Sequence, residues 1–287
     1  MPELTLPIEA TAFVVVDVET TGLGQADRVI EIAAIRLERF QEVARFQSLV
    51  NPGITIAPAA SAVSGITDEM VSRAPIFPEV APEFERLIGD AVFVAHNAPF
   101  DLQFLSRERK RWDLAPWKGP VLDTLRLARN TVELPGYSLG ALQEALQLEH
   151  APAHRALADV LATVSLLHHL IERIDPRPRT LGELLKAQEP VPVPWEAARD
   201  KGLETSMLFR LRDAEQRGQI VELEYEGRAG IHAYWLRPVG AEHNGHLYYV
   251  RAELAEGDDV RVFRFDRIRG VRFPGNGNED QHGTALD

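Results

Sequence analysis

The sequence predicts an α/β domain in its first part, followed by a small β-rich domain. Three observations support this. Short apolar runs alternate with helix-like segments over residues 1–175. Prolines then become frequent over residues 176–203, which we interpret as a linker with one short helix near residues 181–187. Strand-like segments separated by glycines fill residues 204–274. Residues 275–287, rich in glycine, asparagine and acids, are expected to be a disordered tail.

The first domain begins with three strand-like segments. Residues 13–18 form an apolar run that ends in acids, residues 29–37 alternate around Ile30, Ile32 and Ile35, and residues 43–50 can return beside them as a meander. Further strands are expected at residues 91–95 and 121–123, and helical spacing is found at residues 78–88, 100–109, 139–148 and 155–174.

The second domain is expected to begin with a helix over residues 204–217. Five strand-like segments follow, at residues 220–225, 231–236, 246–253, 260–265 and 268–273. Short strands at this spacing are typical of a small barrel or sandwich.

Composition limits the classes of protein to which the chain can belong. The chain has 287 residues, of which 45% are apolar and 26% charged, as in globular proteins. Its longest apolar runs are of strand length, and its first residues lack a basic region followed by an apolar stretch. Without cysteine it can form neither a disulfide nor a thiolate metal site. We therefore expect a cytoplasmic protein with no membrane segment.

The net charge of −12 argues against nucleic-acid binding by bulk positive charge. However, carboxylates that bind divalent cations also make a sequence acidic, and the bound ions reverse the local sign. Acids and bases balance over residues 205–274, so any electrostatic attraction for nucleic acid must be local.

Two acids end the first predicted strand. Asp17 and Glu19 are two residues apart, so their side chains project from the same face of the strand. Like charges this close repel each other unless a cation lies between them. Alone, such a pair is more often two surface acids at the end of a strand.

Two later strings add acids and a histidine. In residues 96–101, Asn97 can cap a helix that has Pro99 in its first turn, but capping does not require Asp101. Residues 154–159 begin with His154 and end with Asp159. Five residues turn a helix by about 500°, so the two side chains would not share a face inside a helix. His154 is therefore expected on the preceding loop, where a histidine suits a proton acceptor.

The three strings in this order resemble the DEDD-type 3′-to-5′ exonucleases that carry a histidine in the third motif, a family that includes the epsilon subunit of bacterial DNA polymerase III. The resemblance covers residues 10–174 and implies a ribonuclease H-like fold. Residues 63–69 and 137–139 also look like the family's connecting segments. Ser64 stands where many relatives have histidine, at a position that is not catalytic in the family.

The resemblance implies a complete catalytic set. Asp17, Glu19, Asp101 and Asp159 would hold two divalent cations, Mg²⁺ or Mn²⁺, and His154 would be the general base. Four carboxylates balance two such ions, which prefer oxygen ligands. The product would be a nucleoside 5′-monophosphate released from a 3′ end. Five further residues match family positions that touch the terminal nucleotide, namely Thr20, Thr21, Leu23, Asn97 and Phe100, although Leu23 and Phe100 can instead be core residues.

The segment 208–273 resembles the WYL domain, a small barrel related to Sm and SH3-like folds. The resemblance depends on residues 221–225, 237–238, 248–250 and 263–268. It implies binding of nucleic acid or nucleotide-like ligands. The candidate contacts are Arg237, Arg251, Arg264, Arg267 and Tyr248. Alternatively, the aromatic side chains fill the core and the arginines pair with acids of this domain.

The sequence therefore predicts a metal-dependent 3′-to-5′ exonuclease that acts on single-stranded DNA ends in repair or proofreading, with polymerase or repair proteins as possible partners. Two alternatives stay open. One is an exoribonuclease with the same chemistry, since nothing in the sequence identifies a contact to a 2′-hydroxyl. The other is a regulatory or binding module associated with a polymerase, although such a protein needs no converging acids.

Overall fold

The computed structural model describes residues 2–148, 155–193, 195, 203–227, 230–244, 247–255 and 260–274. His154, most of the second half of the expected linker and the expected tail lie outside these residues. The chain divides into two compact units, Met1–Glu189 and Pro190–Asp287, each of which is described by itself.

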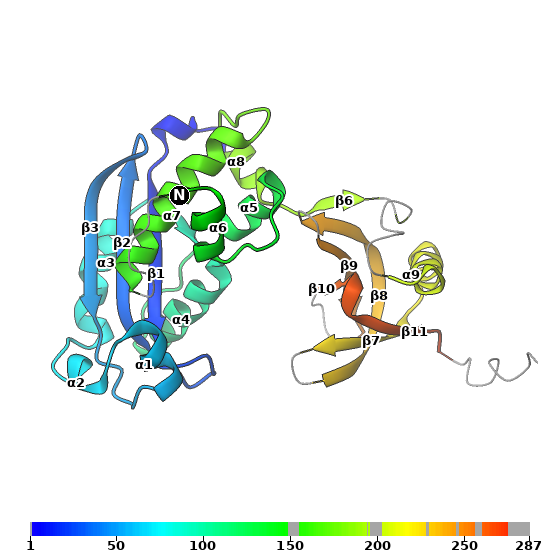
Figure 1. Ribbon diagram of the computed structural model, residues 1–287, viewed down its shortest axis with the longest axis horizontal. Helices are drawn as coiled ribbons and strands as arrows, with labels where there is room; N and C mark the ends of the chain where they lie inside the picture. Colours follow the sequence, from blue (N-terminus) through cyan, green and yellow to red (C-terminus); the bar gives the residue numbers. More distant parts are fainter. Residues whose placement is uncertain are drawn as a thin grey trace, which may run out of the picture. The chain divides into compact units, whose positions relative to one another are not determined.

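The first unit is built on a mixed five-stranded sheet (Figure 1). Strands β1 (Phe13–Thr20), β2 (Val29–Glu38) and β3 (Gln41–Leu49) form an antiparallel meander. Strands β4 (Val92–Ala95) and β5 (Val121–Asp123) run parallel to β1. The order across the sheet is β3-β2-β1-β4-β5, so β1 is central and its acidic end meets the ends of β4 and β5 at one edge.

Helices cover both faces of the sheet. Val15, Ala33 and Ile35 pack into one core cluster that contains α7, while Val14 and Val16 pack into another that contains α3 and α4. The helical segments are η1 (Ile8–Ala10), α1 (Pro58–Ser64), α2 (Asp68–Val71), α3 (Phe77–Ile88), α4 (Ala98–Arg111), α5 (Thr124–Thr131), α6 (Leu139–Ala145), α7 (Ala156–Arg173) and α8 (Leu181–Ala187). Within the described residues, none of the helices has both the length and the apolar character needed to cross a bilayer.

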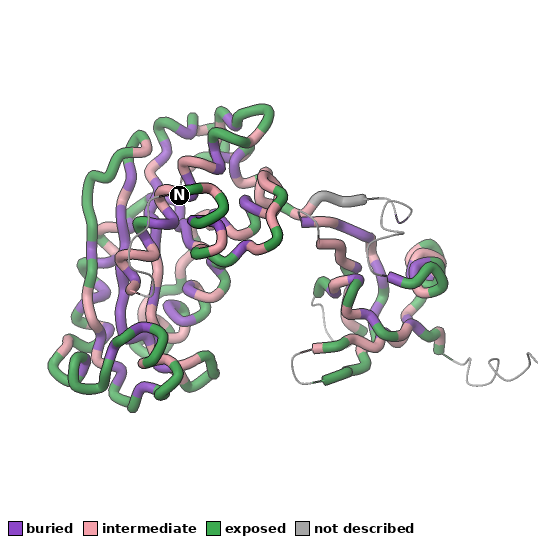
Figure 2. The backbone as a smooth tube through the Cα atoms, viewed as in Figure 1, coloured by how far each residue is buried: buried purple, intermediate pink, exposed green. Residues whose placement is uncertain are grey.

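Burial on both faces explains why the central strands are continuous apolar runs. Figure 2 shows buried backbone along β1 and β2, whereas the edge strand β3 is mostly exposed. A strand between two helical layers needs apolar residues at every position, while an edge strand keeps polar ones. Asp17 and Glu19 therefore interrupt a strand whose other residues are buried.

Part of the segment expected as a linker belongs to the first unit. Leu181 and Leu184 of α8 are fully buried, and the backbone N–H of Gly182 donates to Leu4 O (2.8 Å). The side chain of Gln188 then accepts from the N–H of Asp123 (2.6 Å) and donates to Val121 O (2.8 Å). These contacts attach the chain to edge strand β5, and the first unit extends to Glu189.

The second unit is an antiparallel sheet with one long helix, α9 (Thr205–Arg217). Its order is β10-β9-β8-β7-β11, with β6 paired to β8. Among the described residues, no pairing joins the end strands β10 and β11, so the expected closed barrel is not shown. The strands are β6 (Val191–Val193), β7 (Val221–Gly227), β8 (Gly230–Asn244), β9 (Leu247–Leu254), β10 (Val260–Arg264) and β11 (Ile268–Arg272), with a 3-10 turn η3 (Phe265–Arg267).

Strand β8 is longer than the sequence pattern indicates. We expected it to end at residue 236, before Pro238 and Gly240, but it continues to Asn244. The register shifts between Pro238 and Gly240, which leaves Val239 as an extra residue. Gly240 has φ +152°, which few other residues adopt. A β-bulge therefore carries the strand through two residues that usually end one.

Candidate active site

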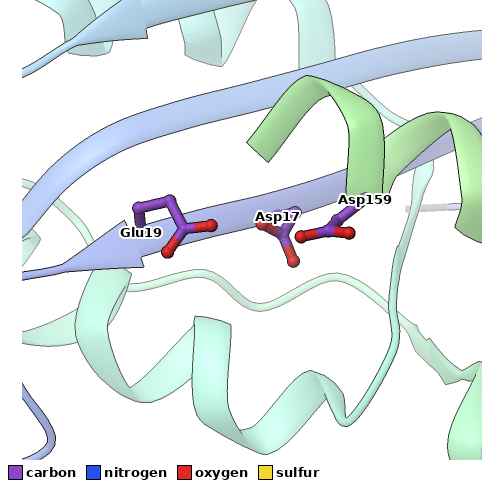
Figure 3. Close-up of side chains that lie close together, drawn as sticks. All are labelled: Asp17, Glu19 and Asp159. Carbon is purple, nitrogen blue, oxygen red and sulfur yellow. The ribbon is translucent and has the colours of Figure 1, made fainter. Parts of the chain in front are cut away.

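Three carboxylates meet at the acidic end of β1. Asp17 and Glu19 come from β1, and Asp159 comes from the first turn of α7. One oxygen atom from each lies within 4.8 Å of the others. Figure 3 shows Asp17 and Asp159 facing each other, with Glu19 beside them. All three side chains are partly exposed, so ions and water can reach the cluster.

Asp101 approaches the same strand from a different helix. It lies in the first turn of α4, which follows β4, and it is only 2% exposed. Its Oδ1 accepts a hydrogen bond from the backbone N–H of Val18 (3.1 Å), midway between Asp17 and Glu19. The four acids expected from the sequence thus converge on β1, although Asp101 is not part of the three-residue group.

The start of α7 shows where the third motif enters the helix. The helix begins at Ala156 with Arg155 as its N-cap residue. The helix thus begins between positions 154 and 159, as the spacing of the two motif residues indicated. The structure of His154 lies outside the described residues, and its role stays a prediction.

The carboxylates raise one another's pKa values. Burial raises the pKa of Asp17 well above its ordinary value, and the charges of Asp101, Asp159, Glu19 and Glu31 raise it further. Burial, with the charges of Asp159 and Glu31, raises the pKa of Glu19 from 4.5 to about 7. Burial also raises the pKa of Asp101. Without a counter-charge, the site therefore resists full ionisation.

This donor set fits divalent cations that prefer oxygen. The acids of the cluster offer carboxylate oxygens alone, as Mg²⁺ and Mn²⁺ sites do. A bound cation would also remove the repulsion that raises these pKa values. The cluster is therefore compatible with divalent metal ions.

The hydroxyl groups of Thr20 and Thr21 shape the turn after β1. Thr20 Oγ1 donates to Gly22 O (2.8 Å), and Thr21 Oγ1 donates to Asp27 Oδ1 (2.7 Å). A Cβ at Gly22 would lie 2.7 Å from the Asp27 carboxylate, so the turn needs glycine there. Thr20 is 7% exposed and Thr21 is fully buried.

Leu23 and Phe100 have different surroundings. Leu23 is 77% exposed, which excludes the alternative that it is a core residue. Phe100 is partly buried and packs on Phe104, with ring centroids 5.0 Å apart. The exposed Leu23 side chain, four residues after Glu19 in the sequence, is available to a ligand, whereas Phe100 belongs to the core at least in part.

Asn97 occupies the N-cap position of α4, but its side chain does not cap the helix. Its φ is +69° and its side chain makes no capping hydrogen bond, so the capping alternative is wrong. Asp123 instead accepts from the Asn97 backbone N–H (3.1 Å). The neighbouring His96 ring bridges Thr124 Oγ1 (3.0 Å) and Tyr137 O (2.9 Å). Hydrogen bonds to residues outside the turn thus hold it in place, and the exposed Asn97 side chain is available for other contacts.

Glu31 is an acid that the sequence analysis did not single out. It lies opposite Glu19 in the β1–β2 register and is fully buried. It pairs with Arg155 (2.7 Å) at the start of α7. Its signal in the sequence is a glutamate within the otherwise apolar run of β2.

In the second unit, register separates the candidate contacts into two groups. Arg237 lies opposite Glu253, Arg251 opposite Val262, and Arg264 opposite Tyr249, so their side chains share one face, which we call the outer face. Tyr248 lies on the other side and packs against Phe265 of the core (6.2 Å).

The outer face also carries two aromatic residues that we had not identified. Trp235 precedes Arg237 by two residues and is 46% exposed. Tyr249 lies on it in place of Tyr248. Arg237 pairs with Glu253 (3.2 Å) and Arg264 with Asp266 (2.6 Å), as the alternative of structural pairing expected. Pairs this exposed contribute little to stability and can open to a ligand.

Comparisons with known proteins agree with this geometry. Over 164 residues, 56% of this chain, it is 41% identical to a PolC-type DNA polymerase III of Oceanobacillus iheyensis, of which it covers 12%. Over 182 residues, 60% of this chain, it is 40% identical to a DNA polymerase III subunit epsilon-like protein of Rhodobacter capsulatus, of which it covers 25%. The chain thus spans a quarter or less of these two relatives.

A solved structure gives a similar result. Exonuclease X in complex with 5′ overhanging duplex DNA matches with a TM-score of 0.52 and 28% identity, covering 62% of this chain and 99% of that one. The first unit therefore has the ribonuclease H-like exonuclease fold.

Family models match both units. The WYL domain matches residues 206–273, which include nearly all of α9 and strands β7 to β11. The exonuclease family matches residues 14–167, which include Asp17, Glu19, Asp101 and Asp159. Because this match extends over more than half of the sequence, the chain belongs to the exonuclease family.

Proposed function

We propose that the protein is a metal-dependent 3′-to-5′ exonuclease that releases nucleoside 5′-monophosphates from single-stranded DNA. The observation that carries the proposal is the convergence of Asp17, Glu19 and Asp159 within 4.8 Å, beside Asp101. A protein that only binds a partner has no need of converging acids that repel each other. We also propose that it works in the cytoplasm, where a polymerase or repair protein would be its partner.

The residues of the chain divide the work between holding ions and moving a proton. Asp17, Glu19, Asp101 and Asp159 would hold two divalent cations, which supply charge stabilisation to the attacking and leaving oxygens of an in-line displacement. From the family resemblance, His154 would accept the proton of the attacking water. The Val18 N–H donates to the Asp101 carboxylate and so helps to hold this candidate ligand in place beside β1.

The turns next to the acids would receive the terminal nucleotide. Leu23 is exposed enough to pack on a base, and Asn97 offers an amide at the second motif. The hydroxyls of Thr20 and Thr21 are engaged within the turn, so we propose that these two residues act by shaping it. Phe100 would contribute through the ring surface that its packing on Phe104 leaves accessible.

The outer face of the WYL unit would extend the contact with single-stranded nucleic acid. Exposed aromatic rings can stack on bases while arginines contact phosphates. Trp235 and Tyr249 supply the rings, and Arg237, Arg251 and Arg264 the cations. Arg267 of η3 and Tyr248 stay secondary candidates. We keep the proposal that this unit closes into a small barrel.

Digestion of end-labelled nucleic acids tests the proposed reaction. Single-stranded DNA, duplex DNA and RNA, labelled at either end, are incubated with Mg²⁺, Mn²⁺ or EDTA. We expect the 5′-labelled single strand to shorten gradually and the 3′-labelled one to release a mononucleotide at once, with either metal and not with EDTA. If RNA is digested faster than DNA, the proposed substrate is RNA instead of single-stranded DNA. If no 3′ end releases nucleotide with either metal, the protein is not this enzyme.

A further inference from the structure

The buried Glu31 makes four hydrogen bonds through its carboxylate. Oε1 accepts from Arg155 Nη2 (2.7 Å) and from Gln47 Nε2 (3.0 Å). Oε2 accepts from Arg155 Nε (3.0 Å) and from the backbone N–H of Ala156 (3.1 Å). An ionised carboxylate has about four acceptor sites, so these bonds fill its capacity. Glu31 therefore lies beside the metal-ligand candidates without being able to join them.

These bonds fix the start of α7. The first N–H groups of a helix lack partners inside the helix, and a residue at the N-cap usually supplies one. Arg155 occupies that position but makes no side-chain capping bond. Glu31 supplies it instead from strand β2, 125 residues away in the sequence. Its negative charge also suits the positive end of the helix dipole.

The first turn of α7 carries the third motif. Asp159 lies three residues after Ala156, and His154 directly precedes Arg155. Two of the three residues that bond Glu31, Arg155 and Ala156, thus lie between the two motif residues in the sequence. On the sheet, Glu31 of β2 lies directly opposite Glu19 of β1, which belongs to the cluster.

From this arrangement we infer that Glu31 is a positioning residue: with Arg155 it anchors the start of α7 to β2 and thereby sets the place of Asp159 relative to Asp17 and Glu19. The inference rests on the proposed function for its consequence in catalysis, but the anchor itself is a property of the fold. Outer partners of metal ligands typically contribute 10- to 100-fold to metal affinity or activity. We expect Glu31 to act in this range.

The anchor is tested in the full chain with five proteins. These are the wild type, Glu31→Gln, Arg155→Gln, the double variant, and Glu85→Gln as control. Glu85 pairs with Arg109 (2.7 Å) between α3 and α4, so its replacement also removes an ion pair of the first unit but leaves α7 untouched. The measurements are hydrogen exchange in the first turn of α7, Mn²⁺ affinity from the free-ion EPR signal, and kcat and KM on single-stranded DNA.

We expect each anchor variant to exchange faster in the first turn of α7, to bind Mn²⁺ about 10- to 100-fold more weakly and to lose kcat with little change in KM. The double variant should lose no more than the more affected single variant, because both changes remove the same contact. Glu85→Gln should match the wild type in all three measurements.

Two results would overturn the anchor. In the first, the anchor variants match Glu85→Gln in first-turn hydrogen exchange and in Mn²⁺ affinity. In the second, the losses of Mn²⁺ affinity in the two single variants add up in the double variant. If Glu31→Gln does not fold, Arg155→Gln decides, since that side chain is 42% exposed. If the wild type digests no nucleic acid, the proposed function fails, while exchange and Mn²⁺ binding still decide whether the anchor exists.

Discussion

Replacing Glu19 by glutamine should stabilise the metal-free protein. The pKa of Glu19 is raised from 4.5 to about 7, mainly by burial and by Asp159. At about 1.4 kcal/mol per pKa unit, this shift corresponds to roughly 3 kcal/mol of destabilisation when Glu19 is charged. Because the carboxyl group is partly exposed, solvent screening reduces the figure to about 1.5 kcal/mol. Removing the charge should recover this amount.

The effect has a defined pH window. An acid with a raised pKa binds more protons in the folded state, so its unfavourable contribution grows as pH rises from about 4.5 to about 7. Glu19→Gln should therefore melt about 3–6 °C higher than the wild type at pH 8 and nearly equally at pH 4.5, in EDTA. Glu83→Gln, at an exposed carboxylate of α3, is the control and should change neither value.

The measurement is thermal unfolding followed by circular dichroism at both pH values. A lower melting temperature for Glu19→Gln at pH 8, or the same gain at both pH values, would refute the claim that charge repulsion destabilises the site. Adding Mn²⁺ should stabilise the wild type more than the variant, because the variant lacks one ligand.

Three further predictions concern metal, catalysis and nucleic acid. Mn²⁺ affinity, measured by titration calorimetry, should rise between pH 6 and pH 8 because Glu19, with a pKa of about 7, must lose its proton to bind; a flat profile would remove Glu19 from the ligand set. Asp17→Ala and Asp101→Ala should abolish nucleotide release while circular dichroism stays native, and an active variant would contradict the assignment. Arg251→Ala should weaken single-stranded DNA binding and reduce the slope of log affinity against log salt by about 0.7, whereas Arg45→Ala on β3, paired locally with Glu42 (2.6 Å), should leave the slope unchanged.

The long elements of the first unit were predictable because their environment is uniform. Strand β1 and strand β2 are buried on both faces, so continuous apolar runs identify them. The sequence pattern does not predict the short helices α1 and α5, because few of their residues form the apolar stripe that marks a helix. In α1 only Ser64 is buried, so no apolar stripe marks the helix. Helix α5 follows strand β5 directly: Asp123 ends the strand, as expected, and its side chain also caps the helix, which no apolar pattern indicates.

The candidate site was predictable where residues act through their own type and spacing. Asp17 and Glu19 share a strand face whatever surrounds them, and the gap between His154 and Asp159 already required a helix start between them. The role of Glu31 could not be found this way, because it depends on β2 meeting α7 across more than 120 residues. The outer face depends likewise on register, which decides that Tyr249 and not Tyr248 lies beside the arginines.

Glu31 and Glu19 are neighbours in the β1–β2 register, yet their pKa values shift in opposite directions. Burial alone would raise the pKa of Glu31, but hydrogen bonds from Arg155, Gln47 and Ala156 outweigh it and hold the pKa below its ordinary value. Glu19, directly opposite, has a raised pKa. Arg155 is thus hydrogen-bonded to Glu31, whereas its charge lowers the pKa of Glu19 too little to offset burial and the neighbouring acids, so a cation from solution would complete the neutralisation. An arginine nearer Glu19 would stabilise the empty site and weaken its affinity for the metal. The unfavourable charge that would lower stability without metal would therefore also be the source of the metal affinity that we propose for the site.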